Sequence, residues 1–181
     1  ALSHSVRTGL IESLLNLIED RSVEGIILIG EGRTFFAGAD ISEFGKPMIG
    51  PDLNKVINTF EESTKPVVAA LHGTPLGGGL ELAMGCNYRV ALSSTKLGLP
   101  EVTLGIIPGA GGTQRLPRLA GVEKSLSMIT SGRPINAKEA LEFNIVEEIY
   151  EDALLANTLN FIKTKISKQS HPKTRDLNEK I

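Results

Sequence analysis

Two short apolar runs place the strongest constraint on how this chain of 181 residues can fold. Residues 26–29 lie between two glycines, and residues 67–71 follow Pro66. Continuous apolar runs of this length are typical of strands that are covered on both faces, as in parallel sheets. Between them, residues 52–62 have the apolar spacing of a helix. This order of elements predicts an α/β fold with largely parallel strand pairing.

The same alternation continues along the chain. We expect a single hydrophobic core over residues 1–150, followed by a helix and a polar connector over residues 151–181. The length and the 41% content of hydrophobic residues suit one well-buried domain. Further helices are expected at residues 6–18, 80–84, 113–119, 123–131, 137–143 and 152–168, and strands at residues 88–92 and 96–99, with a strand or a turn at residues 146–150.

Composition argues against several functional classes. The 19 basic and 21 acidic residues nearly balance, and only 4% of residues are aromatic, so we expect no nucleic-acid partner. A single cysteine, Cys86, excludes an internal disulfide and a cysteine-based zinc site. The histidines, His4, His72 and His171, are too scattered to predict a metal site. No apolar run reaches the roughly 20 residues of a membrane span, and no signal peptide is recognisable, so we expect a location inside the cell.

Glycine-rich turns next to glutamates carry the chemical signal. Gly78 lies where a predicted strand gives way to a helix, and Glu81 follows in the first helical turn. An amide at such a position has no partner inside the helix and suits a negatively charged oxygen. Tight strand–helix packing and phosphate binding are the alternatives for the glycines, although no Gly-Lys-Ser or Gly-Lys-Thr follows, which disfavours a Walker-type loop. Glu81 could equally be a partner of the helix dipole, and Glu101 could be a turn residue.

Three segments together are more specific than any of these features alone. Residues 36–41, residues 77–83, and residues 98–105 with their continuation to Arg115 resemble the enoyl-CoA hydratase/isomerase (crotonase) superfamily in order and spacing. Within it, the sequence is most similar to the hydratase part of multifunctional fatty-acid oxidation enzymes. The resemblance implies a crotonase-like spiral of ββα units whose N-terminal strands and C-terminal helices lie outside this sequence.

That resemblance also implies an activity: hydration of 2-enoyl-CoA thioesters to 3-hydroxyacyl-CoA in fatty-acid β-oxidation. The alternatives are Δ3-to-Δ2 enoyl-CoA isomerisation and a non-catalytic acyl-CoA-binding or RNA-binding module on the same fold. No cofactor is implied beyond the CoA that forms part of the substrate. As partners it implies a homotrimer or hexamer, or a 3-hydroxyacyl-CoA dehydrogenase domain in a longer chain. The location would be the cytoplasm, or the mitochondrial matrix or peroxisome of a eukaryote.

The site residues implied by the resemblance fall into two groups. Catalysis is assigned to the side chains of Glu81 and Glu101 and to the backbone amides of Ala39 and Gly78, which would form the oxyanion hole. Arg115 and Arg118 could meet the CoA phosphates or could pair on a helix surface. Substrate binding is assigned to Ala37, Ala39, Asp40 and Ile41 around the CoA adenine, to Gly78, and to Gly109 near the reacting water.

Overall fold

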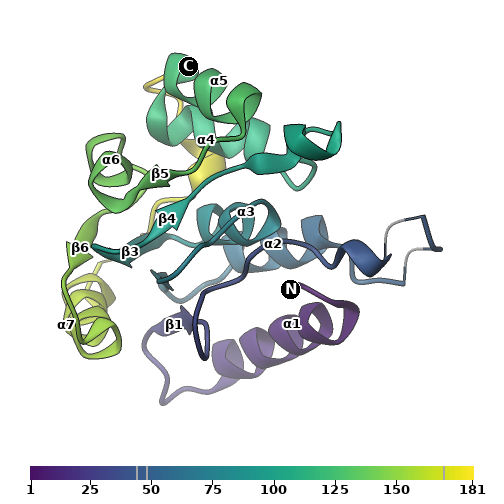
Figure 1. The fold of residues 1–181 in the computed structure, drawn as a ribbon. Coiled ribbons are helices and arrows are strands. Elements are labelled where there is room, and N and C mark those ends of the chain that lie inside the picture. Colours follow the sequence, from purple (N-terminus) through teal and green to yellow (C-terminus); the bar gives the residue numbers. More distant parts are fainter. Residues whose placement is uncertain (44, 48, 169) are drawn as a thin grey trace.

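The computed structural model describes residues 1–43, 45–47, 49–168 and 170–181, and only the backbone of Ile41 (Figure 1). Helices and strands alternate through these ranges. The helices are α1 (His4–Glu19), α2 (Leu53–Glu61), α3 (Gly78–Gly85), α4 (Gly112–Ala120), α5 (Val122–Ser131), α6 (Ala137–Glu142) and α7 (Leu154–Ile166), with short 3-10 helices η1 (Ile41–Glu43), η2 (Pro100–Leu104) and η3 (Thr174–Asp176). The strands are β1 (Ile26–Ile29), β2 (Val67–Leu71), β3 (Tyr88–Leu92), β4 (Lys96–Leu97), β5 (Ile135–Asn136) and β6 (Glu148–Tyr150).

The central sheet has the strand order β1-β2-β3-β6, and every neighbouring pair is parallel. Strand β2 lies inside the sheet and is buried along its whole length, which explains its unbroken apolar run. Strand β1 is at the edge, and its last residue, Ile29, is 36% exposed. The prediction of cover on both faces is therefore confirmed for β2 and wrong for the end of β1.

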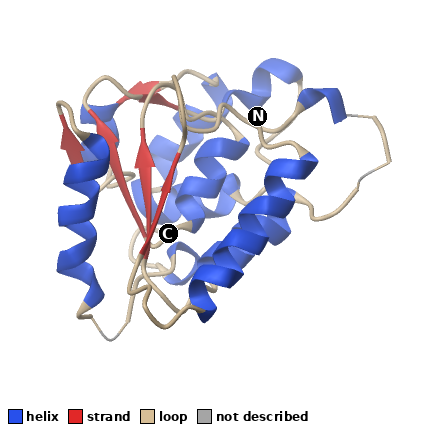
Figure 2. Cartoon of the chain, turned by 90° about the horizontal axis from the view of Figure 1, so that it is seen from below, coloured by secondary structure: helices blue, strands red, loops and turns tan. Residues whose placement is uncertain are grey.

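The two faces of the sheet carry different helices. Val67, Ala69 and Leu71 of β2 pack in a large apolar cluster with residues of α1, α2 and α3. Val68 and Ala70 point the other way and pack against α7. This alternation follows from the two-residue period of a strand. Figure 2 shows α7 on one side of the strands and the long helix α1 on the opposite side.

Short extended segments form a second set of pairings beside the sheet. Parallel bridges join Leu2 to Ala39 and Leu76 to Gly98, and β4 pairs antiparallel with β5. Each of β1, β2 and β3 is thus followed by a second extended segment before the next helix. This repeat is the predicted spiral of ββα units. The two-residue strand β5 was not predicted, since it is too short to show a period.

The C-terminal part packs on the same core. Besides α7 on the sheet, the segment from residue 171 to residue 180 lies against α4 and the end of α2. It also reaches the start of β3, where the Asn87 side chain donates to the Pro172 carbonyl over 3.0 Å. The division at residue 150 remains a prediction. None of the helices in the described ranges is long and apolar enough to cross a membrane.

Candidate active site

Two backbone amides, those of Ala39 and Gly78, lie next to each other. Gly77 adopts φ +51°, a left-handed conformation that suits glycine, and the chain then enters α3 at Gly78. Within the described ranges, neither the Gly78 N–H nor the Ala39 N–H donates a hydrogen bond. A Cβ atom on Gly78 would stand 3.4 Å from the Ala39 nitrogen, so the two amides are close neighbours. Such a pair can bind one shared acceptor oxygen.

Glu81 is held in the first turn of α3 by a distant turn of the chain. Its Oε1 atom accepts the Ala110 N–H and the Gly112 N–H, each over 2.8 Å. Gly112 makes this approach feasible, because a Cβ there would lie 2.9 Å from Oε1. The side chain is only 2% exposed, and its second oxygen accepts no hydrogen bond from the described residues. One oxygen is therefore fixed and the other is available to a ligand.

Glu101 reaches the same place from η2. Its Oε1 atom lies 3.0 Å from the point where a Cβ on Gly77 would stand. Its Oε2 atom is buried and has no hydrogen-bond partner among the described residues. Buried polar atoms are normally paired, since an unpaired one costs free energy. This oxygen therefore indicates a place for a polar ligand or water.

The electrostatics of the two carboxyl groups favour a proton near neutral pH. Burial raises the pKa of Glu81 to about 7, against the opposing effect of the two amide donors, and the nearby Glu101 carboxyl raises it further. Burial also raises the pKa of Glu101. Two such carboxyl groups beside one cavity can divide the roles of acid and base between them.

The amides and carboxyl groups surround one cavity of about 440 Å³, a volume typical of small-molecule sites. Of the residues expected at the site, Ala37, Ala39, Gly78, Glu81, Glu101 and Gly109 line this cavity. Asp40 instead lines an adjoining cavity of about 730 Å³, which shares Ala39 and Leu53 with the first. The Ile41 side chain lies outside the described part of the structure.

Two residues near the site were not read correctly from the sequence. Asn54 of α2 lines the cavity, and its Nδ2 atom donates to the Gly109 carbonyl over 3.3 Å. Only its helical position was visible in the sequence. Arg115 neither faces solvent nor pairs on a surface. It is buried and forms an ion pair of 2.6 Å with Glu61.

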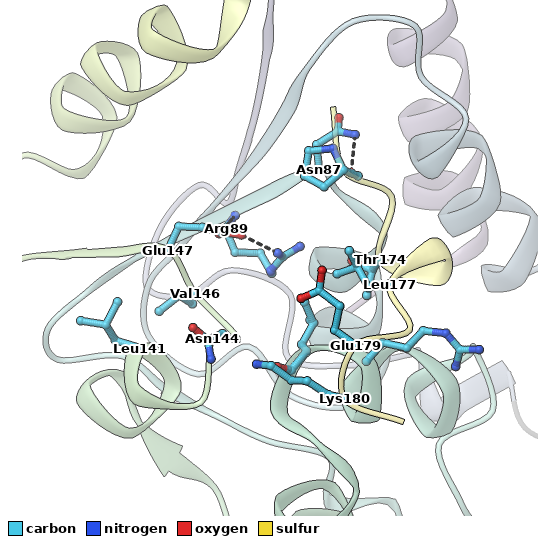
Figure 3. A pocket seen from close by; sticks show the side chains of 13 residues that line it. Asn87, Arg89, Leu141, Asn144, Val146, Glu147, Thr174, Leu177, Glu179 and Lys180 are labelled. Atoms are coloured by element: carbon cyan, nitrogen blue, oxygen red, sulfur yellow. Dashed lines mark hydrogen bonds and ion pairs between the residues drawn. The ribbon is translucent and has the colours of Figure 1, made fainter. Parts of the chain in front are cut away.

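A third cavity, of about 470 Å³, shows that volume alone does not identify the site (Figure 3). It lies under the C-terminal segment and contains the buried Arg89. The Arg89 guanidinium already donates to Glu147, to the Ile145 carbonyl and to the Cys86 carbonyl. The buried charge of this cavity is therefore already paired. The cavity beside Glu81 and Glu101 differs, because a buried oxygen of Glu101 there has no partner among the described residues.

The spiral of ββα units and the cavity lined by Glu81 and Glu101 define the class of protein. The structure superimposes on that of an enoyl-CoA hydratase from Bacillus anthracis with a TM-score of 0.80 and 38% identity, over 90% of this chain and 66% of that one. An enoyl-CoA hydratase from Thermoplasma volcanium also gives 0.80, at 32% identity, over 90% of this chain and 67% of that one. The architecture is therefore that of the crotonase fold.

Sequence comparison gives the family. The model of the enoyl-CoA hydratase/isomerase family matches residues 1–181, and the chain belongs to this family. A peroxisomal bifunctional enzyme of Danio rerio is 45% identical over 93% of this chain and 23% of its own length. A probable enoyl-CoA hydratase of Bacillus subtilis is 47% identical over 81% of this chain and 59% of its own length. The chain thus spans about a quarter of the bifunctional relatives.

Proposed function

We propose that this protein adds water to 2-enoyl-CoA thioesters and releases 3-hydroxyacyl-CoA, a step of fatty-acid β-oxidation. One observation carries the proposal: two amides with no partner among the described residues and two carboxyl groups with raised pKa values line the same cavity. The amides suit a carbonyl oxygen that becomes negatively charged, and the carboxyl groups suit proton transfer beside it. Family membership and the names of the relatives point to the same chemistry.

In this mechanism, the thioester oxygen accepts hydrogen bonds from the Ala39 and Gly78 amides. This draws electrons from the conjugated double bond and makes the β-carbon electrophilic. Negative charge grows on the oxygen as an enolate forms, so the two donors bind the transition state more tightly than the substrate. Removing one such donor costs roughly 2.7–4 kcal/mol in other enzymes.

The two glutamates handle the water. The free oxygen of Glu81 accepts a hydrogen bond from a water molecule, while Glu101 exchanges protons with that water and the α-carbon. The water oxygen forms a bond to the β-carbon, the double-bond electrons move toward the thioester, and the α-carbon gains a proton. The net change is the addition of one water molecule. A shared proton between the two carboxyl groups near pH 7 suits these roles.

The proposal also covers the longer chain, the cellular location and the assembly in which the reaction takes place. Four bifunctional relatives, with identities of 41–45%, support a chain in which this hydratase works beside a dehydrogenase domain. Their names support a peroxisomal location if the source is a eukaryote. Assembly as a homotrimer or hexamer remains a prediction.

Incubation with crotonyl-CoA tests the function. We expect loss of the enoyl absorbance and a product with the mass of 3-hydroxybutyryl-CoA. Conversion of a 3-enoyl-CoA to the 2-enoyl isomer, without hydration, would support the isomerase instead. Tight binding of acyl-CoA with neither reaction would contradict both and support a binding module.

A further inference from the structure

The turn formed by residues 108–112 decides where the Glu81 carboxyl group lies. Both donors to Glu81 Oε1, the Ala110 and Gly112 amides, belong to this turn. The turn contacts α2 on one side, through Asn54 and the Gly109 carbonyl. It contacts α4 on the other side, where Arg115 Nη1 donates to the Ala110 carbonyl over 3.3 Å. Ala110 is therefore held through its N–H by Glu81 and through its C=O by Arg115.

Gly111 brings the turn directly onto the guanidinium. It adopts φ +92°, and a Cβ atom there would stand 2.2 Å from Arg115 Nη1. The glycine thus serves two needs, a left-handed backbone and a close approach to a buried cation.

Arg115 is itself fixed by Glu61 of α2. Its Nη2 atom lies 2.6 Å from Glu61 Oε2 and its Nε atom 3.1 Å from Oε1, which is the two-pronged geometry of a strong arginine–carboxylate pair. The two side chains are 8% and 1% exposed. The Arg175 N–H of the C-terminal segment also donates to Glu61 Oε1, over 3.1 Å.

A buried ion pair of this kind contributes little net stability, because the cost of removing both charges from water offsets their attraction. Its place beneath the turn gives it another use. We propose that Arg115, held by Glu61, is a positioning residue for Glu81: it fixes Ala110 so that the amides of the turn orient the carboxyl group toward the cavity. This positioning role rests on the proposed function only in one respect, namely the catalytic role of the oriented Glu81.

The charge of Arg115 adds a second effect. It lowers the pKa of Glu81 and so counteracts burial and the neighbouring Glu101. The charged groups around Glu81 are thus Glu101 from η2, Arg115 from α4 and, behind Arg115, Glu61 from α2. Loss of the arginine should both loosen the turn and raise the pKa of Glu81.

Two variants separate this role from folding. The double variant Glu61→Leu with Arg115→Met removes both charges of the pair and leaves no buried charge unpaired. Arg115→Lys keeps the positive charge and loses the fork that joins Glu61 to Ala110. In both we expect kcat for crotonyl-CoA to fall about tenfold or more with KM nearly unchanged, since a misplaced catalytic group slows the chemical step.

Carboxyl ¹³C NMR titration gives a readout that does not depend on activity. The Glu81 signal is assigned by its loss in Glu81→Gln. We expect its pKa to rise in the double variant, where the positive charge is lost and the two amide donors are no longer held in place, and to rise by less in Arg115→Lys, where the charge remains. If the wild type fails to hydrate crotonyl-CoA, the proposed function fails, and the titration still decides the positioning role.

A control removes another arginine–glutamate pair, Arg89 with Glu147, as Arg89→Met with Glu147→Leu; its arginine is buried and its glutamate side chain is 33% exposed. This pair lies under the C-terminal segment (Figure 3). The Arg89 guanidinium donates to Ile145, Cys86 and Glu147, none of which belongs to the 108–112 turn. Whatever its melting temperature, the Glu81 titration should match the wild type. An unchanged Glu81 pKa and unchanged kcat in the folded double variant or in Arg115→Lys would overturn the proposal, as would an equal shift in the control.

Discussion

The amide nitrogen of Ala39 lies 3.4 Å from the point where a Cβ atom on Gly78 would stand. A side chain at residue 78 would therefore enter the space in which the two amides meet an acceptor oxygen. The same Cβ would lie 2.6 Å from Leu53 Cδ2, the far end of a flexible side chain that can move. A methyl group at residue 78 should therefore disturb the fold little, while it would obstruct the proposed oxyanion hole.

Gly78→Ala should keep the fold and lose activity. We expect kcat for crotonyl-CoA hydration to fall at least ~10²-fold, because the methyl group would push the acceptor oxygen away from the amides and so match the loss of one oxyanion donor. The melting temperature should change little. Steady-state kinetics and thermal unfolding measure the two effects. Gly79→Ala is the contrasting variant, because its Cβ would stand 1.9 Å from the Phe36 carbonyl oxygen and backbone must move. Full activity in Gly78→Ala would show that the acceptor oxygen does not bind in the space that the added methyl group occupies.

Glu101→Gln keeps the shape of the side chain and removes its ability to take a proton. We expect turnover to fall at least ~10²-fold, the usual contribution of general acid–base catalysis. The measurement is kcat at pH 7 with circular dichroism as the check on folding. Glu62→Gln, at an exposed residue that pairs with Lys173, provides a control that should hydrate normally. Near-normal turnover in folded Glu101→Gln would exclude the role given to this carboxyl group.

Coupling between the two carboxyl groups predicts a shift at a distance. Because the Glu101 charge is one cause of the raised Glu81 pKa, Glu101→Gln should move the Glu81 titration to lower pH. Carboxyl ¹³C NMR of the variant and the wild type gives both values. An identical Glu81 titration in the two proteins would mean that the carboxyl groups do not interact.

The buried Glu81 should lower the stability of the protein as pH rises. Its pKa is about 7 in the folded state and 4.5 in the reference state, so between these values the unfolded chain binds fewer protons than the folded one. Glu81 therefore does not reduce the free energy of unfolding below pH 4.5, and it reduces this free energy increasingly as the pH rises through 7. On this basis Glu81→Gln, which is neutral at every pH, should gain roughly 3 kcal/mol over the wild type between pH 5 and 8.

Urea unfolding of both proteins at pH 5, 6, 7 and 8 checks this difference. Glutamine Oε1 can still accept the Ala110 and Gly112 amides, so the hydrogen bonds do not confound the comparison. A difference in unfolding free energy that stays constant with pH would show that Glu81 titrates normally.

The sequence predicts the parts of the site that are local and leaves out those that depend on distant contacts. Gly78 and Glu81 lie on one turn of α3, so a strand–glycine–helix pattern was enough to place them together. The two amides that hold Glu81 come from residues 110 and 112, and no local pattern links them to α3. The pairing of Arg115 with Glu61 spans 54 residues, which is why an exposed role was expected for this arginine.

The fold follows the same division. The apolar run of β2 correctly predicted a buried strand. β2 lies inside the sheet, where helices cover both of its faces. The similar run of β1 occupies an edge, and edge positions are set by strand order, which single-strand patterns do not encode. Asp40 lines the adjoining cavity, and the chain enters η1 at the next residue, Ile41.

A crystal structure with butyryl-CoA, a saturated thioester that cannot be hydrated, tests the central claim most directly. We predict that the thioester oxygen lies about 3 Å from both the Ala39 and the Gly78 nitrogen, with a water molecule between the carboxyl groups of Glu81 and Glu101 on the face of the β-carbon. A thioester oxygen bound elsewhere, or an acyl group that lies outside the space between the two glutamates, would contradict the account.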